Sequence, residues 1–242
     1  MSLFDAHCHL ANLAEILPLA PILDEAEQSG ITRFASSALR KSEVAYHLSH
    51  PDSRIVFSAG IHPNFAECDL DLSTLKALCE DKSIWAIGEI GLDKGNPELA
   101  LQRKVFSQQL DLAMEYRLPV VLHIVGHTSE VYQTMKQYPL KCLIHGYAGS
   151  DEGFRELAKL DSLFTISSRI VKEDKLDLLM AMLHSGRYLF ETDITQYYVQ
   201  EGESNPLLRL IELVSRCAEL SNISREELIK RQGINARKLF PQ

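Results

Sequence analysis

The sequence predicts an α/β protein built as a single (β/α)8 barrel of the TIM type, with a metal site at the carboxyl ends of its strands. Three observations support this prediction: eight short apolar runs recur along the 242 residues, helix-like stretches separate them, and ligand-type side chains follow five of the runs. Strands that alternate with helices form βαβ units and a parallel sheet. In a parallel barrel the carboxyl ends of all strands meet at one mouth.

The eight apolar runs are nearly continuous, as expected for strands that are buried on both faces. They cover residues 2–7, 31–36, 54–62, 84–91, 119–124, 141–146, 163–167 and 188–193. An open doubly wound sheet is the alternative architecture. It gives no reason for ligand-type residues to recur at the ends of the runs, so we favour the closed barrel.

Three stretches between or after the runs predict helices. In 97–117, Pro97 suits the first helical turn and apolar residues recur at helical spacing. The stretch 151–159 begins with Asp151, which we expect to act as the N-cap. The stretch 224–240 predicts a final helix that is broken near Gly233. No linker rich in proline, glycine or serine divides the chain, so we expect one domain over residues 1–242.

Composition and charge limit the classes of function. The formal net charge of −8 argues against a surface that binds nucleic acid broadly by charge, so such a substrate would be held locally. Five cysteines without a CxxC motif predict neither a disulfide framework nor a structural zinc site, and they favour a reducing, cytoplasmic location. The amino terminus shows no signal-peptide pattern, and no apolar run is long enough to predict a membrane span.

Six residues of the kinds that bind divalent cations lie at the ends of apolar runs. They are His7, His9, Glu89, His123, His145 and Asp193. On a strand, His7 and His9 share one face, so both imidazoles can reach one ion while Cys8 points away. Glu89 lies between apolar residues and close to two glycines, and a buried glutamate requires a partner or a metal.

Each candidate also has an ordinary structural interpretation. The HxH motif fits a solvated turn, Glu89 a strand end in solvent, and a single histidine at a strand end a hydrogen-bonded core position. Asp193 could cap the following helix, and Glu191 or Thr192 could compete with it as a ligand. In a closed barrel the eighth strand lies beside the first, so Asp193 would lie near the HxH motif, which favours a shared metal site.

Other residues have supporting roles in this prediction. His62, in the sequence GIHP, could contact an anionic substrate or make a supporting hydrogen bond. Asp5 could orient a ligand histidine. Lys94 suits a solvated loop, and Cys8 and Cys142 suit small core positions.

With these residues identified, the chain resembles the TatD family of metal-dependent hydrolases, which are amidohydrolase-like barrels. The resemblance runs in the family's order through DAHCHL, GIHP, AIGEIGLD, LPVVLH, HGYAGS, ETD and NARKLF, and so covers nearly the whole chain. It implies a (β/α)8 barrel with a two-metal site and metal-dependent deoxyribonuclease activity, often exonucleolytic on single strands.

The resemblance also implies a role for each candidate. His7, His9 and Asp193 would bind one cation and His123 and His145 the other, with Glu89 bridging the two. Glu89 and Asp193 would thus be catalytic residues as well as ligands. His62 would lie beside the substrate phosphate.

The chain departs from the family pattern on the substrate side. The family usually has an arginine where this chain has Val125. The segment after Asp193 reads ETDITQYY and lacks the family's proline, and HGYAG stands where the family has HCFSG. The candidate metal ligands are thus intact, whereas their substrate-facing neighbours have changed.

We therefore expect a monomeric hydrolase that uses two divalent cations (Zn²⁺, Mg²⁺, Mn²⁺ or similar) to cleave phosphodiester bonds, with DNA as a locally bound substrate and Asp193 as the proton acceptor. A second possibility is the hydrolysis of an amide, a lactone or another phosphoester. Many such barrels bridge their metals with a carboxylated lysine, and here Glu89 stands at that place. A third is a non-catalytic metal-binding descendant, which the altered TQYY segment suggests.

Overall fold

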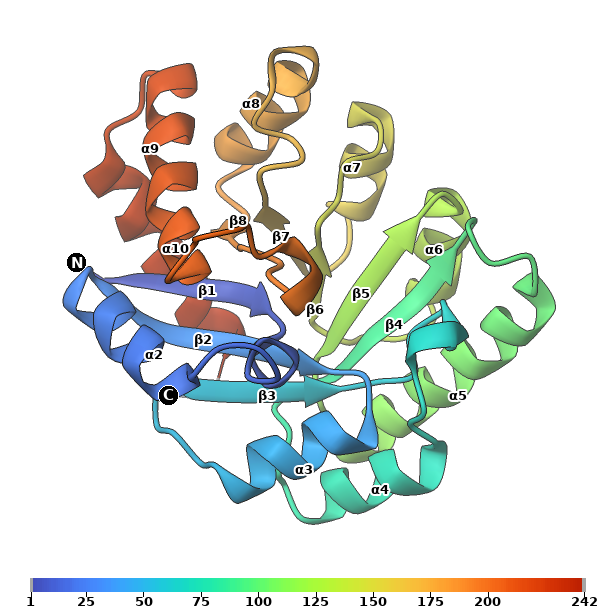
Figure 1. The fold of residues 1–242 in the computed structure, drawn as a ribbon. Helices are drawn as coiled ribbons and strands as arrows, with labels where there is room; N and C mark the ends of the chain where they lie inside the picture. Colours follow the sequence, from blue (N-terminus) through green and yellow to red (C-terminus); the bar gives the residue numbers. More distant parts are fainter. Residues whose placement is uncertain (1, 241–242) are drawn as a thin grey trace.

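The computed structural model describes residues 2–240, and its eight parallel strands follow one another in chain order around a closed barrel (Figure 1). β8 pairs with β1, so the sheet has no free edge. The predicted fold class is therefore confirmed. The strands are β1 (Leu3–Cys8), β2 (Ile31–Ala38), β3 (Ile55–Ala59), β4 (Ile87–Asp93), β5 (Val120–Val125), β6 (Cys142–His145), β7 (Ser162–Ile166) and β8 (Tyr188–Phe190).

Helices follow the strands and cover the outside of the barrel (Figure 1). The α-helices are α1 (Leu10–Leu13), α2 (Leu19–Gln28), α3 (Lys41–Ser49), α4 (Leu72–Glu80), α5 (Leu99–Tyr116), α6 (Thr128–Met135), α7 (Asp151–Leu157), α8 (Leu176–Ser185), α9 (Arg209–Ser221) and α10 (Arg225–Leu239). Four short 3-10 helices lie in the loops: η1 (Phe65–Glu67), η2 (Glu173–Lys175), η3 (Gln196–Tyr198) and η4 (Pro206–Leu208).

Alternation along the strands separates the barrel interior from the layer beneath the helices. On β5 and β6, the inward positions carry Val121 and Leu143, and two residues later His123 and His145. Val121 and Leu143 belong to a small cluster of buried apolar residues that fills the barrel below the mouth. Phe240 contributes to this cluster. The histidines therefore lie directly above a well-packed apolar cluster, which holds the backbone of their strands in place.

Several element boundaries differ from those predicted. The third and eighth runs leave strand geometry early, at Ala59 and Phe190, so Asp193 lies beyond the strand. Its φ of +51° is in the left-handed region, outside the range of a strand. The helix near residue 151 is capped by Ser150, whose hydroxyl accepts a hydrogen bond from Gly153 N–H at 3.1 Å, and not by Asp151.

The final helix is continuous, so the predicted break near Gly233 is wrong. Ser224 caps α10 by accepting a hydrogen bond from Glu227 N–H. A glycine in a helix interior costs only about 1 kcal/mol relative to alanine. Tertiary contacts offset that cost: the Gln232 amide donates to the Phe4 carbonyl, and Asn235 donates to the Tyr188 carbonyl.

Among residues 2–240, no helix combines the length and the apolar character needed to cross a bilayer. Cys8 and Cys142 are buried, as predicted for small core residues. The single-domain organisation, the monomeric state and the cytoplasmic location remain predictions.

Candidate metal centre

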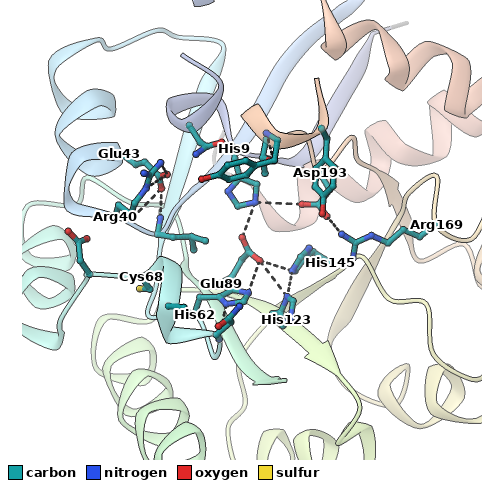
Figure 2. A pocket seen from close by; sticks show the side chains of 18 residues that line it. His9, Arg40, Glu43, His62, Cys68, Glu89, His123, His145, Arg169 and Asp193 are labelled. Atoms are coloured by element: carbon teal, nitrogen blue, oxygen red, sulfur yellow. Dashed lines mark hydrogen bonds and ion pairs between the residues drawn. The ribbon is translucent and has the colours of Figure 1, made fainter. Parts of the chain in front are cut away.

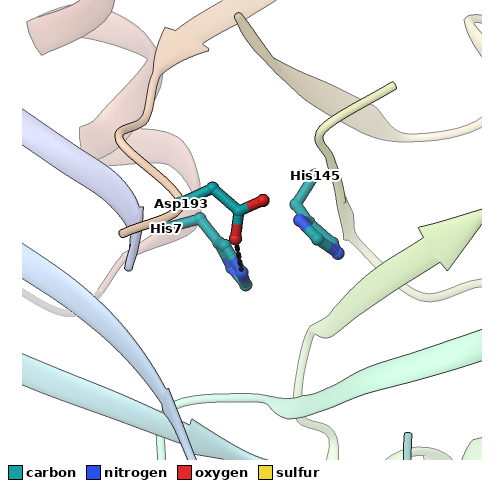
Figure 3. A group of neighbouring side chains, drawn as sticks. All are labelled: His7, His145 and Asp193. Carbon is teal, nitrogen blue, oxygen red and sulfur yellow. Dashed lines mark ion pairs between the residues drawn. The ribbon is translucent and has the colours of Figure 1, made fainter. Parts of the chain in front are cut away.

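The six candidate ligands converge at the mouth of the barrel around Glu89; Figure 2 shows five of them, and Figure 3 shows His7. Glu89 Oε1 lies 3.3 Å from His7 Nε2 and 3.2 Å from His9 Nε2. Glu89 Oε2 lies 2.8 Å from His145 Nε2 and 3.7 Å from His123 Nδ1. The two oxygens of one buried carboxylate therefore face two different sets of imidazoles.

Asp193 completes the side of the cluster that holds the HxH motif. Its Oδ1 lies 3.5 Å from His7 Nε2 and 3.6 Å from His9 Nε2. Backbone hydrogen bonds fix this placement, because Asp193 N–H donates to the His7 carbonyl and His9 N–H donates to the Ile194 carbonyl. Figure 3 shows the Asp193 carboxylate beside His7, with His145 across from them. The His7 and His145 rings stack with their centroids 4.0 Å apart.

His62 belongs to the same cluster. Its Nε2 lies 3.7 Å from Glu89 Oε2. The ligand-type atoms of His62, Glu89 and His123 all lie within 4.8 Å of one another. His62 is thus a third imidazole close to Glu89 Oε2, beside His123 and His145.

The polar atoms of this cluster fit a cation. His7 Nε2 and Glu89 Oε1 are buried and have no hydrogen-bond partner among the described residues. A buried polar group without a partner costs about 1–3 kcal/mol, and more if it is charged. Imidazole nitrogens and carboxylate oxygens are the donors that Zn²⁺, Mn²⁺ and related ions prefer. A divalent cation between these atoms would satisfy them all.

The pKa values follow from the mixture of charges in a buried space. Burial raises the pKa of Glu89, but the imidazoles of His145, His7 and His9 outweigh it and hold the pKa well below its usual range. Burial lowers the pKa of His123, yet its contacts with the Asp93 and Glu89 carboxylates raise that pKa to about 9. Burial lowers the pKa values of His145 and His62 to about 4, which favours their neutral forms. The cluster thus offers anionic carboxylates and neutral imidazoles, which are the forms that bind a cation.

Comparison with known proteins agrees with this geometry. The family model described as TatD related DNase matches residues 4–241. The chain belongs to this TatD-related family. It is 27% identical to an uncharacterized metal-dependent hydrolase of Haemophilus influenzae, over 99% of this chain and 100% of the relative. It is 26% identical to the 3'-5' ssDNA/RNA exonuclease TatD of Pantoea ananatis, over 98% of this chain and 99% of the relative.

A solved structure shows the same fold. The TatD homologue YJJV of Escherichia coli superposes with a TM-score of 0.85, covering 98% of this chain and 97% of that one at 24% identity. Together with the family match, the buried cluster of histidines and carboxylates identifies the chain as a TatD-family metal-dependent hydrolase.

Hydrogen bonds around the cluster of this TatD-family chain show which residues orient the imidazoles. Asp93 Oδ2 lies 3.0 Å from His123 Nε2, and Ser37 Oγ lies 3.4 Å from His7 Nδ1. Asp5 contacts a candidate ligand through the backbone, because His7 N–H donates to Asp5 Oδ1 at 3.4 Å. Its carboxylate accepts hydrogen bonds from the Thr192 backbone N–H and hydroxyl, at 3.0 and 2.6 Å, and so ties β1 to the segment after β8.

The two residues expected to compete with Asp193 lie elsewhere. The Thr192 hydroxyl is bonded to Asp5. Glu191 is fully buried, with its Oε2 4.0 Å from His145 Nδ1, on the opposite side of that ring from Glu89. Burial and the nearby Asp193 charge raise the pKa of Glu191 well above its usual range, which favours the neutral acid. Neither residue joins the clustered ligand atoms found among the described residues.

Glycine allows the close approach of β4 and β5 at this site. A Cβ at Gly91 would lie 2.0 Å from the His123 carbonyl oxygen, and the φ of Gly91 is +144°. A Cβ at Gly88 would lie 2.4 Å from Val121 Cβ. Both contacts are shorter than real side chains permit. The glycines flanking Glu89 thus bring its strand against the strand that carries His123.

Above the cluster, a cavity of about 440 Å³ opens to solvent, and residues on several loops line it. Arg169, in the loop after β7, donates from Nη2 to Asp193 Oδ2 at 2.8 Å (Figure 2). Arg40 also lines the cavity, but it is paired with Glu15 and Glu43 at 2.7 and 2.8 Å. We did not identify Arg169 from the sequence, because a lone arginine in a loop carries no spacing signal.

The departures from the family pattern lie around this mouth. Val125 pairs in register with Asp93 at the ends of β5 and β4, and it is half-buried. Among the described residues that line the cavity, Arg40 and Arg169 are the only arginines or lysines. Tyr197 and Tyr198, from the altered segment after Asp193, also line it and are exposed.

Proposed function

We propose that this TatD-family hydrolase is a two-metal phosphodiesterase of the deoxyribonuclease type. The observation that carries the proposal is the placement of Glu89. One of its oxygens faces His7 and His9, and the other faces His123 and His145. A carboxylate between two sets of nitrogen donors suits a pair of neighbouring cations that share one bridging ligand.

In this proposal His7, His9 and Asp193 hold one divalent cation, His123 and His145 hold the other, and Glu89 serves both. When bound, the cations supply a nucleophilic water at neutral pH and neutralise charge on the phosphate. His62, within 3.7 Å of Glu89 Oε2, lies where it can contact either the second cation or a phosphate oxygen.

Asp193 has the geometry of a proton acceptor at the edge of the cluster. Its Oδ1 faces His7 and His9, whereas its Oδ2 accepts a hydrogen bond from Arg169, and both residues line the cavity. We assign the proton of the attacking water to Oδ2, because Oδ1 is directed at the two histidines. Arg169 has further donors on its guanidinium, with which it would contact a phosphate oxygen.

Relatives support DNA as a substrate, whereas the charge of the chain limits how DNA can be held. The Pantoea ananatis relative is named as an exonuclease of single-stranded DNA and RNA. The net charge of −8 does not favour broad electrostatic binding of a polyanion. The substrate would therefore be held at the mouth by the cations and a few local contacts.

The test combines metal analysis with activity. The purified protein would be depleted of metal and then loaded separately with Zn²⁺, Mn²⁺ and Mg²⁺. Labelled single- and double-stranded DNA would be supplied to each form. We expect about two equivalents of metal to bind and DNA to be cleaved only after loading.

Lactone, ester and amide substrates form the second arm of the same experiment. Turnover of one of these without cleavage of DNA would replace the phosphodiesterase with another metal-dependent hydrolase. Two equivalents of bound metal without turnover of any substrate would indicate a non-catalytic descendant.

A further inference from the structure

We propose that Tyr197 and Tyr198 form a base-stacking surface at the mouth of the candidate metal centre and thereby determine which phosphodiesters reach it. This inference rests on the proposed phosphodiesterase function and adds the residues that select the substrate. Both tyrosines lie on η3, which begins three residues after Asp193. Both line the cavity that also contains His9 and Asp193.

The two side chains are unusually exposed for their type. Tyr197 is 70% exposed and Tyr198 is 56% exposed, the highest values among the large hydrophobic residues of the described chain. Within residues 2–240, no hydrogen bond to either hydroxyl and no ring contact accounts for their position. Proteins bind unpaired bases with exposed aromatic rings of this kind, and here two adjacent rings lie beside the cavity that contains the candidate ligands.

The backbone under the rings is held firmly although the rings are free. Gln196 N–H donates to Asn12 Oδ1 at 2.8 Å, and the Gln196 side chain donates to Glu15. Arg209 donates to the Tyr198 carbonyl at 2.9 Å. A fixed backbone places both rings at the mouth before substrate arrives, so little backbone entropy is lost on binding.

Electrostatics around the cavity favours stacking as the source of affinity. The Arg40 guanidinium is paired with Glu15 and Glu43, and Arg169 is paired with Asp193. Exposed Asp69 adds negative charge to the lining. Because both arginines of the lining are paired and the chain is acidic, protein contacts to phosphate groups beyond the metal centre would be weak. Every base has a flat π-face, so stacking supplies affinity without requiring either positive charge or a particular sequence.

The binding test uses the metal-loaded protein and a short single-stranded oligodeoxynucleotide that carries one 2-aminopurine and slowly cleaved phosphorothioate linkages. Stacking quenches 2-aminopurine fluorescence. We expect quenching with the wild type and with the Tyr197→Phe/Tyr198→Phe variant, which keeps both rings. The Tyr197→Ala/Tyr198→Ala variant should lose the quenching and bind roughly 10- to 100-fold more weakly. Equal binding by the wild type and the alanine variant would overturn the proposal.

Two further variants separate stacking from general apolar contact and from loss of the fold. Tyr197→Leu/Tyr198→Leu keeps apolar area without a π-face and should behave like the alanine variant. If it matches the phenylalanine variant, stacking is wrong. Met114→Ala truncates a 39% exposed apolar residue near the far end of α5 and should bind like the wild type. With unmodified DNA, the alanine variant should raise KM while kcat stays within about twofold.

An abasic oligonucleotide of equal length and charge distinguishes failure of this inference from failure of the proposed function. We expect the wild type to bind it roughly 10- to 100-fold more weakly than the normal oligonucleotide, and the alanine variant to show no further loss. Equal cleavage of both oligonucleotides by both proteins would retain the phosphodiesterase and reject stacking. If no loaded form cleaves any DNA, the proposed function fails, and the quenching experiment still decides whether the tyrosines bind bases.

Discussion

The inner ring and the rim of the mouth obey different constraints. The inner ring consists of the six candidate ligands: His7, His9, Glu89, His123, His145 and Asp193. The rim consists of residues that line the cavity above it: Arg40, Cys68, Arg169, Tyr197 and Tyr198. Side chains of the inner ring are no more than 13% exposed, whereas Arg169 is 46% exposed and Tyr197 70%.

This difference predicts that the inner ring tolerates fewer substitutions than the rim. A charge buried in the inner ring must have a partner or a cation, so few side chains can replace Glu89 without a large cost. A rim residue faces water in the absence of substrate. Tyr197 or Arg169 can therefore change with little effect on folding, and the substrate preference can change with them.

Asp193→Asn gives the largest expected effect, because it changes an inner-ring residue that also faces the cavity. We expect kcat/KM to fall by about a thousandfold or more, since the amide cannot accept the proton. The fold and the melting temperature should stay close to those of the wild type. Asp69→Asn changes an exposed carboxylate at the cavity and should retain activity within about threefold. Near-normal turnover by Asp193→Asn would contradict its assigned role.

Metal titration of Glu89→Gln and Asp93→Asn tests whether the inner ring holds two cations that share a ligand. Glu89→Gln should weaken both binding steps by at least about 100-fold, because both sets lose a charged oxygen. Within the inner ring Asp93 is bonded to His123 alone, at Nε2 and 3.0 Å, so Asp93→Asn should weaken one step by about 10- to 100-fold. Calorimetry or metal analysis shows whether one binding step or both are weakened. Equal weakening of both steps by Asp93→Asn would argue against two separable sites.

Gly91→Ala tests the backbone on which the inner ring depends. The added Cβ meets the His123 carbonyl, and the positive φ of Gly91 disfavours any side chain. We expect about 3 kcal/mol of lost stability from strain and overpacking together. Gly202→Ala is the matched control, because Gly202 has a φ of +77° with nothing within 4 Å of its Cβ position. It should lose only about 1 kcal/mol in denaturant unfolding. Equal losses of stability in the two variants would show that the contact between Gly91 and the His123 carbonyl is unimportant.

His47 shows what burial does to a histidine outside the inner ring. Burial, together with the positive charge of His9, lowers its pKa from 6.5 to about 4, whereas carboxylates raise the pKa of His123. Below pH 6.5 the His47 imidazole binds a proton in the unfolded chain, whereas in the folded protein it binds one only near pH 4. The contribution of His47 to stability is thus intact above pH 6.5 and falls by up to about 3 kcal/mol as the pH drops to 4. His47→Gln should flatten that part of the stability curve; parallel curves would contradict this assignment.

The smallest effect should come from the arginines of the rim. Arg169→Gln should raise KM about tenfold with little change in stability, since it loses a charged contact to phosphate. Arg40→Gln should raise KM by less than about threefold, because Nε and Nη2 of Arg40 are bonded to Glu43 and Glu15, whereas Arg169 is bonded to Asp193 through Nη2 alone. Steady-state kinetics on single-stranded DNA measures both. Equal effects would show that the rim acts through its overall charge and not through Arg169.

Particular residues show how far the sequence could predict the structure. Apolar runs that end in His123 or His145 predicted both the strands and the convergence, because burial on both faces leaves a local pattern. The break expected at Gly233 did not occur, since Asn235 and its neighbours bind carbonyls of distant strands. Asp93 was overlooked as a partner of His123 because a carboxylate at a strand end has the same local pattern whether it faces water or an imidazole.

The sequence by itself determined the barrel, the order of its strands and the identity of the inner-ring residues, because hydrophobic periodicity and the chemistry of each side chain are properties of short segments. Only the tertiary structure could show that the two oxygens of Glu89 face different histidines, and that Arg169 and Tyr197 stand at the same mouth as Asp193. Those relations are distances between loops and strands far apart in the chain, and closure of the barrel is what sets them.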